Sequence, residues 1–411
     1  MFLADPSRSG VSPAFPRCLS PEARWKFKTE GEVYSSPAIV GGIAYFGSRD
    51  YCLYAVDIST GKERWRFQSV AGIESSPVIQ RDTLYFGTGE TTSLYGEPRT
   101  YYLYALDSLT GAERWSFKVP QSVTSSPAVK DDTVYFGCED TFLYALNAKT
   151  GQEKWRFKTG DSISSSPAVS GGAVYFGSWD GNIYALEAKS GKLRWSFKTG
   201  GDISSSPAVV GGTLYVGSED YFLYALDAET GKLKWKFETG MHIFSSPAVY
   251  RGTVYFGSVD SYLYAVEAAT GRERWRFKTD RWITSSPAVA EGVVYIGSLD
   301  SHLYAVDASK AEEIWRFKTN GGIGSSPALA HDTIFITSGD SYLYALRCTR
   351  QRGKPHQDVP LKTSTTCTTD ADCGEGFSCW YRIPRGPFPG IRGSRENPGW
   401  CWSDEVLRQT N

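Results

Sequence analysis

Histidine and cysteine are the residue types in this chain that could carry acid–base, metal or redox chemistry, and both are few. The sequence has 4 histidines and 8 cysteines among 411 residues. His242 stands in a variable segment, without a second histidine, a cysteine or a paired carboxylate at a spacing typical of a catalytic or metal site. His302, His331 and His356 lie at turn, strand and linker positions. The sequence therefore indicates no catalytic residue, metal or cofactor, and we expect the protein not to be an enzyme.

Half of the cysteines lie close together near the C-terminus, at Cys367, Cys373, Cys379 and Cys401. A segment this short buries too small a core to fold without covalent links, so we expect two disulfides, with three possible connectivities. The spacing lacks the close cysteine pair of structural zinc sites, and an acidic stretch beside Cys373 lacks the later glutamate of a calcium loop. Disulfides form in oxidising compartments, which favours a periplasmic or extracellular protein. The first residues show no signal peptide.

Tryptophans at a fixed period show that the chain is built from repeats, and these repeats must position the histidines and cysteines. They recur every 40 residues except for one interval of 50, at Trp25, Trp65, Trp115, Trp155, Trp195, Trp235, Trp275 and Trp315. Each period contains four short runs rich in β-branched and aromatic residues, for example SSPAVV, TLYVGS, FLYALD and LKWKFE, with turn residues between them. Four strands, A to D, in a period of about 40 residues are typical of a β-propeller blade.

The repeat also carries a family motif. The pattern A-x-D-x-x-T-G-x-x-x-W occurs at Ala225, Asp227, Thr230, Gly231 and Trp235, and copies of it, some with a conservative change, end at Trp65, Trp115, Trp155, Trp195 and Trp275. It resembles the tryptophan-docking motif of the PQQ-like propeller repeat family. The resemblance implies that each of the eight tryptophans has a structural role, because in that family the indole stacks on a glycine peptide of the neighbouring blade. The seventh copy departs from the motif, with Lys310 and Ala311 in place of Thr-Gly.

The two ends of the repeat region complement each other. Trp25 has a strand D but no strands A to C before it, and the last repeat stops after strand C. We therefore expect an all-β, eight-bladed propeller of four-stranded antiparallel blades, closed by the N-terminal strand. Cys18 and Cys348 then fall at the same position of the last blade, where a disulfide could join them and stabilise the ring by about 3 to 5 kcal/mol. Two unrelated thiols are the alternative.

Composition and length restrict the remaining function classes. The net charge is −1, with 44 basic and 45 acidic residues, so we expect no nucleic-acid partner. No apolar run is long enough for a transmembrane helix. We predict four regions: an N-terminal extension at 1–18, the propeller at 19–348, a linker at 349–366 and a small Cys-rich module at 367–411. Cys52 and Cys138 fit simple buried apolar positions.

Residues that vary between repeats are the candidates for partner contacts. In propellers the B–C and D–A loops share one end of the ring, and a ten-residue insertion enlarges the B–C loop of blade two. Aromatic and basic residues in such loops are typical of interface hot spots, although freely varying loops are an equally good explanation. The predicted partner-binding residues are Arg49, Trp179, Asp202, Glu219, Met241, His242, Phe244, Arg281 and Trp282.

Three functions follow from the resemblance and the loops. The first is a noncatalytic scaffold that binds a protein partner in envelope or extracellular assembly, as a propeller lipoprotein of this family does in the outer-membrane β-barrel assembly machinery. The second is a quinone-dependent dehydrogenase, whose relatives use adjacent cysteines against the cofactor. This chain has no adjacent pair of cysteines. The third is an extracellular protein that binds carbohydrate or another surface. We expect the first.

Overall fold

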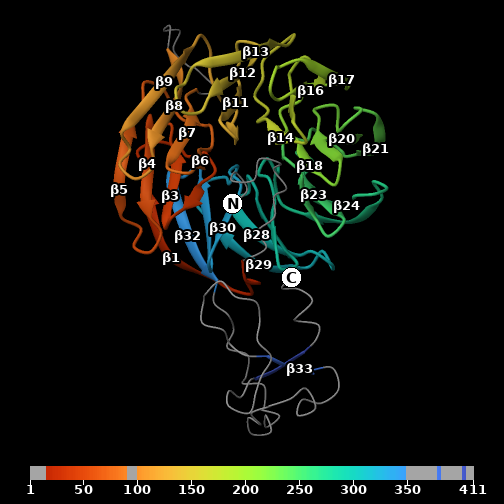
Figure 1. Ribbon diagram of the computed structural model, residues 1–411. Helices are drawn as coiled ribbons and strands as arrows, with labels where there is room; N and C mark the ends of the chain where they lie inside the picture. The colour runs from red at the N-terminus through yellow and green to blue at the C-terminus, as the bar shows by residue number, and fades with distance from the viewer. Residues whose placement is uncertain (1–14, 90–99, 349–376, 381–399, 404–411) are drawn as a thin grey trace, which may run out of the picture. The chain divides into compact units, whose positions relative to one another are not determined.

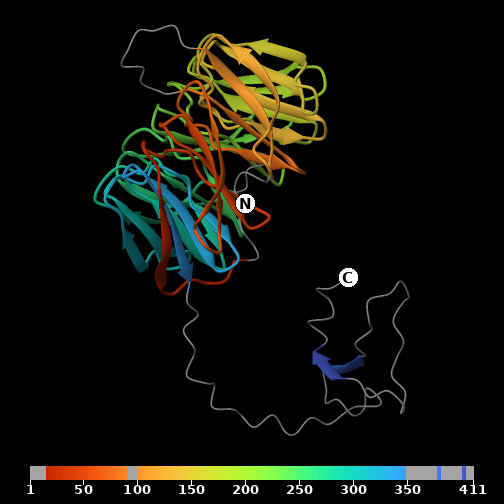
Figure 2. The ribbon, with the colours of Figure 1, turned by 90° about the vertical axis from the view of Figure 1, so that its left-hand side faces the viewer.

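Eight four-stranded antiparallel sheets surround one axis. The computed structural model describes residues 15–89, 100–348, 377–380 and 400–403. In seven of the sheets, four consecutive strands pair in chain order, as a meander, and Figure 1 shows the sheets as successive blades of a ring. Figure 2 turns the blade made of β2 to β5 toward the viewer. The prediction of an eight-bladed propeller is therefore confirmed.

Strands A and B form the inner half of each blade. The A strands of neighbouring blades contact one another around the axis, and each is three residues long because the preceding Ser-Ser-Pro cannot continue the ladder. The A strands are β2 (Ala38–Val40), β6 (Val78–Gln80), β10 (Ala128–Lys130), β14 (Ala168–Ser170), β18 (Ala208–Val210), β22 (Ala248–Tyr250), β26 (Ala288–Ala290) and β30 (Ala328–Ala330). The B strands are β3 (Ile43–Gly47), β7 (Thr83–Gly87), β11 (Thr133–Gly137), β15 (Ala173–Gly177), β19 (Thr213–Gly217), β23 (Thr253–Gly257), β27 (Val293–Gly297) and β31 (Thr333–Ser338).

Strands C and D form the outer half. Strand B is buried on both faces in every blade, whereas most residues of strand D are half-buried or exposed, as expected for an outer edge. The C strands are β4 (Cys52–Asp57), β8 (Tyr101–Asp107), β12 (Phe142–Asn147), β16 (Asn182–Glu187), β20 (Phe222–Asp227), β24 (Tyr262–Glu267), β28 (His302–Asp307) and β32 (Tyr342–Cys348). The D strands are β5 (Glu63–Gln68), β9 (Glu113–Val119), β13 (Glu153–Lys158), β17 (Leu193–Lys198), β21 (Leu233–Glu238), β25 (Glu273–Lys278), β29 (Glu313–Lys318) and β1 (Pro21–Lys28).

The N-terminal strand completes blade eight. β1 pairs antiparallel with β32, with Trp25 opposite Ala345, and the sheet order is β1-β32-β31-β30. A register shift between Ala23 and Trp25 has its counterpart between strands C and D of the other blades, for example at Ala55/Val56. The first strand of the chain thus has the geometry of an ordinary strand D, as the complementary ends predict.

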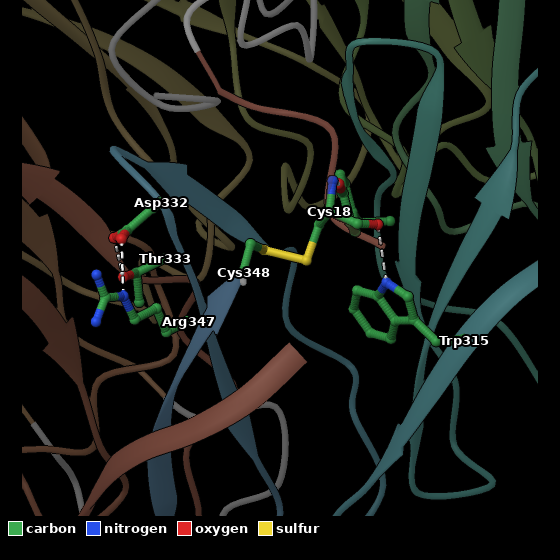
Figure 3. The surroundings of a disulfide bond; sticks show 7 residues. Cys18, Trp315, Asp332, Thr333, Arg347 and Cys348 are labelled. Atoms are coloured by element: carbon green, nitrogen blue, oxygen red, sulfur yellow. Dashed lines mark hydrogen bonds and ion pairs between the residues drawn. A yellow bond between two sulfur atoms is a disulfide. The ribbon is translucent and has the colours of Figure 1, made fainter. Parts of the chain in front are cut away.

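In blade eight, a disulfide joins the end of strand C, β32, to the segment that precedes strand D, β1 (Figure 3). Cys18 and Cys348 are bonded, with their Cα atoms 5.0 Å apart, and both residues are buried. In blade one the single residue Ile58 donates its N–H to Gly42 O and accepts the indole N–H of Trp25. In blade eight Cys348 donates the equivalent N–H to Asp332, and Cys18 accepts the N–H of Trp315. The predicted disulfide is confirmed, and the two cysteines divide the role of one residue.

The repeated tryptophans dock each blade onto the next. Trp195 donates its Nε1 hydrogen to Ala228 O at 3.1 Å, and a Cβ placed on Gly231 would lie only 2.6 Å from its ring. Gly231 has a φ of +71°, so both its conformation and the indole favour glycine there. The seventh copy keeps the hydrogen bond, from Trp275 to Ala308 O at 2.9 Å, with Ala311 at a φ of +60°. In the seventh copy, therefore, an alanine replaces the glycine beside the indole, and the hydrogen bond of the indole is retained.

The second serine of each Ser-Ser-Pro links neighbouring blades near the axis. The backbone N–H of Ser206 donates to Ser246 Oγ at 3.0 Å, and the same bond recurs from blade to blade. It closes where Ser326 N donates to Ser36 Oγ at 2.8 Å. The complete set of donors is Ser36, Ser76, Ser126, Ser166, Ser206, Ser246, Ser286 and Ser326. We call this closed circuit the serine belt.

The aspartate that recurs in the B–C turns of seven blades has a structural role, as the sequence indicates. In blade one, Asp50 accepts hydrogen bonds from the N–H of Cys52, the hydroxyl of Tyr54 and the N–H of Glu30. Burial, followed by the bond to Asp50, raises the pKa of Tyr54. The same three bonds recur at Asp180, Asp220, Asp260, Asp300 and Asp340. These carboxylates fix the turn and the preceding D–A loop together.

The chain divides into two compact units, residues 1–351 and 352–411. In the second unit, β33 (Phe377–Trp380) pairs antiparallel with β34 (Trp400–Ser403), and Cys379 stands opposite Cys401 in the register. Cys367 and Cys373 lie outside the described residues, so the two tail disulfides stay predictions. The finer boundaries predicted around the linker also stay predictions. Within the described part of the chain, no helix has the length and apolar character to cross a membrane.

Candidate binding face and axial cavity

The B–C and D–A loops lie together at one end of the ring, which we call the rim face. Backbone hydrogen bonds join the two kinds of loop in each blade. Trp179 N donates to Ser162 O at 2.9 Å, and Glu219 N donates to Asp202 O at 2.9 Å. Gly89, at the start of the blade-two insertion, donates to Gly72 O at 2.8 Å. The loops that vary most therefore share one surface, although residues 90–99 of the insertion lie outside the described residues.

An axial cavity of about 480 Å³ opens on the rim face. Four consecutive blades, three to six, supply its walls, from residues that directly precede a Ser-Ser-Pro or lie elsewhere in a D–A or B–C loop. Because the A strands surround the axis, these residues face the centre of the ring. The lining residues are Thr124, Ser164, Trp179, Asp202, Ser204, Glu219 and Phe244. The cavity thus combines two aromatic rings, two carboxylates and three hydroxyls.

Hydrogen bonds fix the aromatic wall of the cavity. The Nε1 hydrogen of Trp179 is shared between Ser164 Oγ at 2.8 Å and Ser204 Oγ at 3.1 Å. The Ser204 hydroxyl in turn donates to Glu219 Oε1 at 2.8 Å. The indole is therefore held in one orientation between blades four and five while 36% of its surface stays exposed. A side chain ordered in advance loses less conformational entropy when a ligand binds to it.

Arg49 lies on another side of the same rim, in blade one, and is paired within the chain. Its guanidinium donates to Glu74 at 2.6 Å and to Glu32 at 2.9 Å, and it lies 4.4 Å from the centre of the Tyr34 ring. Burial alone disfavours the charged form, but the bond and charge of Glu74, with smaller effects from Tyr34 and Glu32, raise the pKa of Arg49. Arg49 is thus held by two carboxylates and an aromatic ring.

Glu139 extends the acidic character of the rim to blade three. Its carboxylate accepts a hydrogen bond from Thr124 Oγ1 at 3.1 Å. Burial raises its pKa, the Thr124 bond lowers it, and the nearby charge of Glu74 raises it further, so that the net shift is upward. Thr124 lines the axial cavity, which places this carboxyl next to it.

The remaining predicted rim residues lie outside the cavity lining. Met241 and Trp282 are exposed by 38% and 53%, and Arg281 is exposed beside Trp282. His242 packs edge-on against Tyr221, with ring centres 5.0 Å apart, and its Nδ1 lies 2.6 Å from Glu219 O. A carbonyl oxygen can only accept, so Nδ1 carries the hydrogen. His242 therefore has a positioning contact to the loop that holds Glu219.

Exposed aromatic side chains gather on this face. Among the described residues, the exposed aromatic side chains are Tyr34, Trp179, Tyr221 and Trp282, and all four belong to B–C or D–A loops. By contrast, the exposed apolar residues of the opposite end and the outer strands are aliphatic, such as Leu109, Leu193 and Leu233. Aromatic residues that gather on one end of a closed ring are typical of a binding surface.

The structure separates the predicted rim residues into three sets. Trp179, Asp202, Glu219 and Phe244 line the axial cavity; Met241, His242, Arg281 and Trp282 lie in D–A loops outside its lining; and Arg49 is paired within the chain. Sequence reasoning did not select the cavity residues Thr124, Ser164 and Ser204. Their signal was present, because they occupy the same repeat position as Phe244, directly before Ser-Ser-Pro.

The groups that could hold a metal or a redox cofactor are sparse in the described part of the chain. No three His, Cys, Asp or Glu side chains lie there in an arrangement that could hold a metal ion. Cys52 and Cys138 are free thiols, both buried, in blades one and three. Burial raises the pKa of both thiols, with a contribution from a nearby aspartate in each case.

Comparisons with known proteins agree with this architecture. A family model described as the β-propeller of the beta-alanine-activating enzyme matches residues 99–291 and 169–374, which together span more than half of the chain. The PQQ repeat model described as outer membrane protein assembly factor BamB matches residues 20–99. Because the first model spans more than half of the chain, the chain belongs to the β-propeller family which that model describes, and its repeats are PQQ-like. No curated protein sequence matches it.

Solved structures with a similar fold include BamB and two dehydrogenases. BamB from Moraxella catarrhalis has a TM-score of 0.68 at 19% identity, over 80% of this chain and all of that one. A europium-containing methanol dehydrogenase has a TM-score of 0.69 at 15% identity, over 82% of this chain and 88% of that one. Quinohemoprotein alcohol dehydrogenase from Comamonas testosteroni has a TM-score of 0.70 at 14% identity, over 84% and 79%. At these identities the likeness concerns the fold.

Proposed function

We propose that this propeller is a noncatalytic scaffold that binds a protein partner through its rim face. The observation that carries the proposal is the gathering of exposed aromatic side chains on that face, in a ring whose other recurrent residues are used for docking, turns and closure. The BamB-like fold supports it, since BamB is named as an assembly factor for outer membrane proteins. The buried Cys18–Cys348 disulfide is consistent with an extracytoplasmic location, in the envelope or outside the cell.

The residues of the axial cavity do not fit the quinone of the dehydrogenase relatives. That cofactor carries several carboxylates, whereas the cavity is lined by Asp202 and Glu219 and by no basic residue. Like charges in a partly enclosed site repel, which opposes binding of such an anion. The free thiols Cys52 and Cys138 are buried in different blades and are not an adjacent pair. We therefore infer that the enzyme alternative is the weaker one.

The decisive experiment is affinity capture by the full chain, compared with rim variants. We expect one dominant partner to be captured by the wild type and to be lost when Trp282 and His242 are both replaced by alanine. Leu109→Ala is the matched control, because Leu109 is an apolar residue exposed by 71% in a C–D turn, away from the rim. Equal capture by the wild type and the rim variant would contradict the proposal.

The same variants also test the alternative that the rim face binds carbohydrate. Exposed Trp282 and Tyr221 could also pack against sugar rings, because aromatic faces suit apolar surfaces with polar edges. A glycan array that binds the wild type, and not the Trp282 and His242 variant, would replace the protein-binding proposal with this one.

A further inference from the structure

The axial cavity brings carboxylates and aromatic surface together without a cation of its own. Asp202 and Glu219 line it beside Trp179 and Phe244, and Glu139 lies next to it through Thr124. Among the described residues, none of these three carboxylates forms an ion pair with a lysine, arginine or histidine side chain. Their charges are therefore not neutralised by a partner within the described ring.

Elsewhere on the same rim, the chain fills such an arrangement with its own guanidinium. Arg49 lies over the ring of Tyr34 at 4.4 Å and pairs with Glu32 and Glu74 at 2.9 and 2.6 Å. An arginine is well suited to this environment, because its planar group pairs with carboxylates and stacks on aromatic faces. In blade one, therefore, a guanidinium occupies the space beside an aromatic ring and two carboxylates.

We propose that the axial cavity binds a cationic side chain, an arginine or a lysine, that the partner presents. This inference rests on the proposed function, since it names the chemistry of the partner's contact. The cation would lie against Trp179 and Phe244 and pair with Asp202 and Glu219. A volume of about 480 Å³ accommodates a long side chain with solvent.

The hydrogen bonds of the cavity make this site ready for a cation. The indole N–H of Trp179 already donates to Ser164 and Ser204, so the part of the ring that faces the cavity is its aromatic surface. Ser204 also donates to Glu219, which fixes one carboxylate beside that surface. Asp202 is exposed at the cavity wall and can approach a ligand from the solvent side.

A pair of blocked tripeptides tests the charge requirement. Acetyl-Gly-Arg-Gly-amide and its citrulline analogue have nearly the same shape, but citrulline is neutral. In an NMR titration of the full chain at low salt, we expect the citrulline peptide to bind about tenfold more weakly than the arginine peptide. Added salt should weaken the binding of the arginine peptide. Equal affinity of the two peptides, or no binding of either, would overturn the inference.

Variants locate the site. We expect Trp179→Leu and Asp202→Asn each to weaken binding of the arginine peptide about three- to tenfold, with the thermal midpoint unchanged in Asp202→Asn. Asp131→Asn is the matched control for charge, because Asp131 is exposed in an A–B turn at the other end of the strands. An equal loss in Asp131→Asn and Asp202→Asn would show a general charge effect and refute the site.

The outcome is separable from that of the scaffold proposal. If the arginine peptide binds with these losses but no partner depends on the rim, the cation site stands and the scaffold role falls. If a captured partner depends on Trp282 and His242 while neither peptide binds, the scaffold role stands and the cation site falls.

Discussion

At the scale of single residues, the docking tryptophans show how one side chain secures two blades. Seven of the eight donate to a carbonyl of the next blade, as Trp115 does to Ala148 O at 3.1 Å, and most pack against a glycine with a positive φ. Two physical constraints favour glycine at this position: its backbone conformation, and the space that the indole occupies next to it. These two reasons can be separated by substitution, because other glycines of the repeat have only the first.

Gly231→Ala should therefore destabilise the ring more than Gly211→Ala. Both residues have positive φ, +71° and +57°, so each substitution should cost about 1 kcal/mol for the backbone. Only at Gly231 would the new Cβ lie 2.6 Å from an indole, which should add about 1 to 3 kcal/mol. Urea unfolding of the two variants measures the difference. Equal losses would mean that the docked indole can move aside freely.

Trp65 offers a second comparison, since its buried Nε1 has no hydrogen-bond partner among the described residues. Trp65→Phe removes a polar group that is already unsatisfied, whereas Trp115→Phe removes the bond to Ala148 O. We expect Trp65→Phe to cost about 1 kcal/mol less than Trp115→Phe in free energy of unfolding. A larger loss for Trp65→Phe would contradict this expectation. The same urea titrations give the measurement.

At the scale of elements, the C–D turns are organised by aspartates that accept several hydrogen bonds. Asp107 accepts from the N–H groups of Leu109 and Thr110 and from the side chain of Thr110, and it pairs with Arg114 at 2.8 Å. The Arg114 bond, followed by the Thr110 bonds, lowers the pKa of Asp107 to about 2. Turn aspartates with lowered pKa values also occur in other blades, at Asp57, Asp227 and Asp307.

These turns predict a loss of stability in acid. A carboxyl whose pKa is lower in the folded state stabilises the fold above its unfolded value of about 4, and this stabilisation is lost as the pH falls toward the folded value. We expect the thermal midpoint to fall between pH about 4 and about 2, and Asp107→Asn to make that fall shallower. Differential scanning calorimetry at several pH values checks it. Parallel curves for variant and wild type would count against it.

Repetition explains why the elements could be predicted and the cavity could not. Strands, turns and the docking tryptophans recur in nearly every copy, so one sequence contains several examples of each pattern. The cavity depends on loop residues that vary between blades and on where each side chain points. Trp179 and Trp282 look alike as loop tryptophans, but the first is hydrogen-bonded into the cavity wall and the second projects to solvent. Arg49, predicted as a partner contact, already has its partners within the chain.

At the scale of the whole molecule, closure depends on contacts between the ends of the propeller sequence. β1 pairs along its length with β32, the serine belt closes from Ser326 to Ser36, and the disulfide joins residues 330 positions apart. Phe15 is buried against Tyr295, with ring centres 5.8 Å apart, and Arg17 pairs with Asp307 at 2.8 Å. Residues 15–18, which were predicted to belong to an N-terminal extension, thus pack against the ring.

Removal of the disulfide should weaken the ring without opening it. We expect the Cys18→Ser, Cys348→Ser double variant to be less stable than the oxidised wild type by about 2 to 5 kcal/mol, because the bond lowers the conformational entropy of the unfolded chain. Both proteins keep the tail cysteines, so the comparison reports on this bond. A reducing agent should lower the thermal midpoint of the wild type more than that of the variant. Equal stability of the two oxidised proteins would contradict the expectation.

The disulfide also determines how the molecule responds to mechanical tension. The shortest covalent path between Cys18 and Cys348 is the sulfur bridge, and the blades lie on the long path between them. A pull exerted between a point before Cys18 and a point after Cys348 therefore passes through the bridge and leaves the propeller unloaded. After reduction the same pull would act on β1 and β32 and peel them apart along the chain. The bridge thus makes resistance to stretching depend on redox conditions.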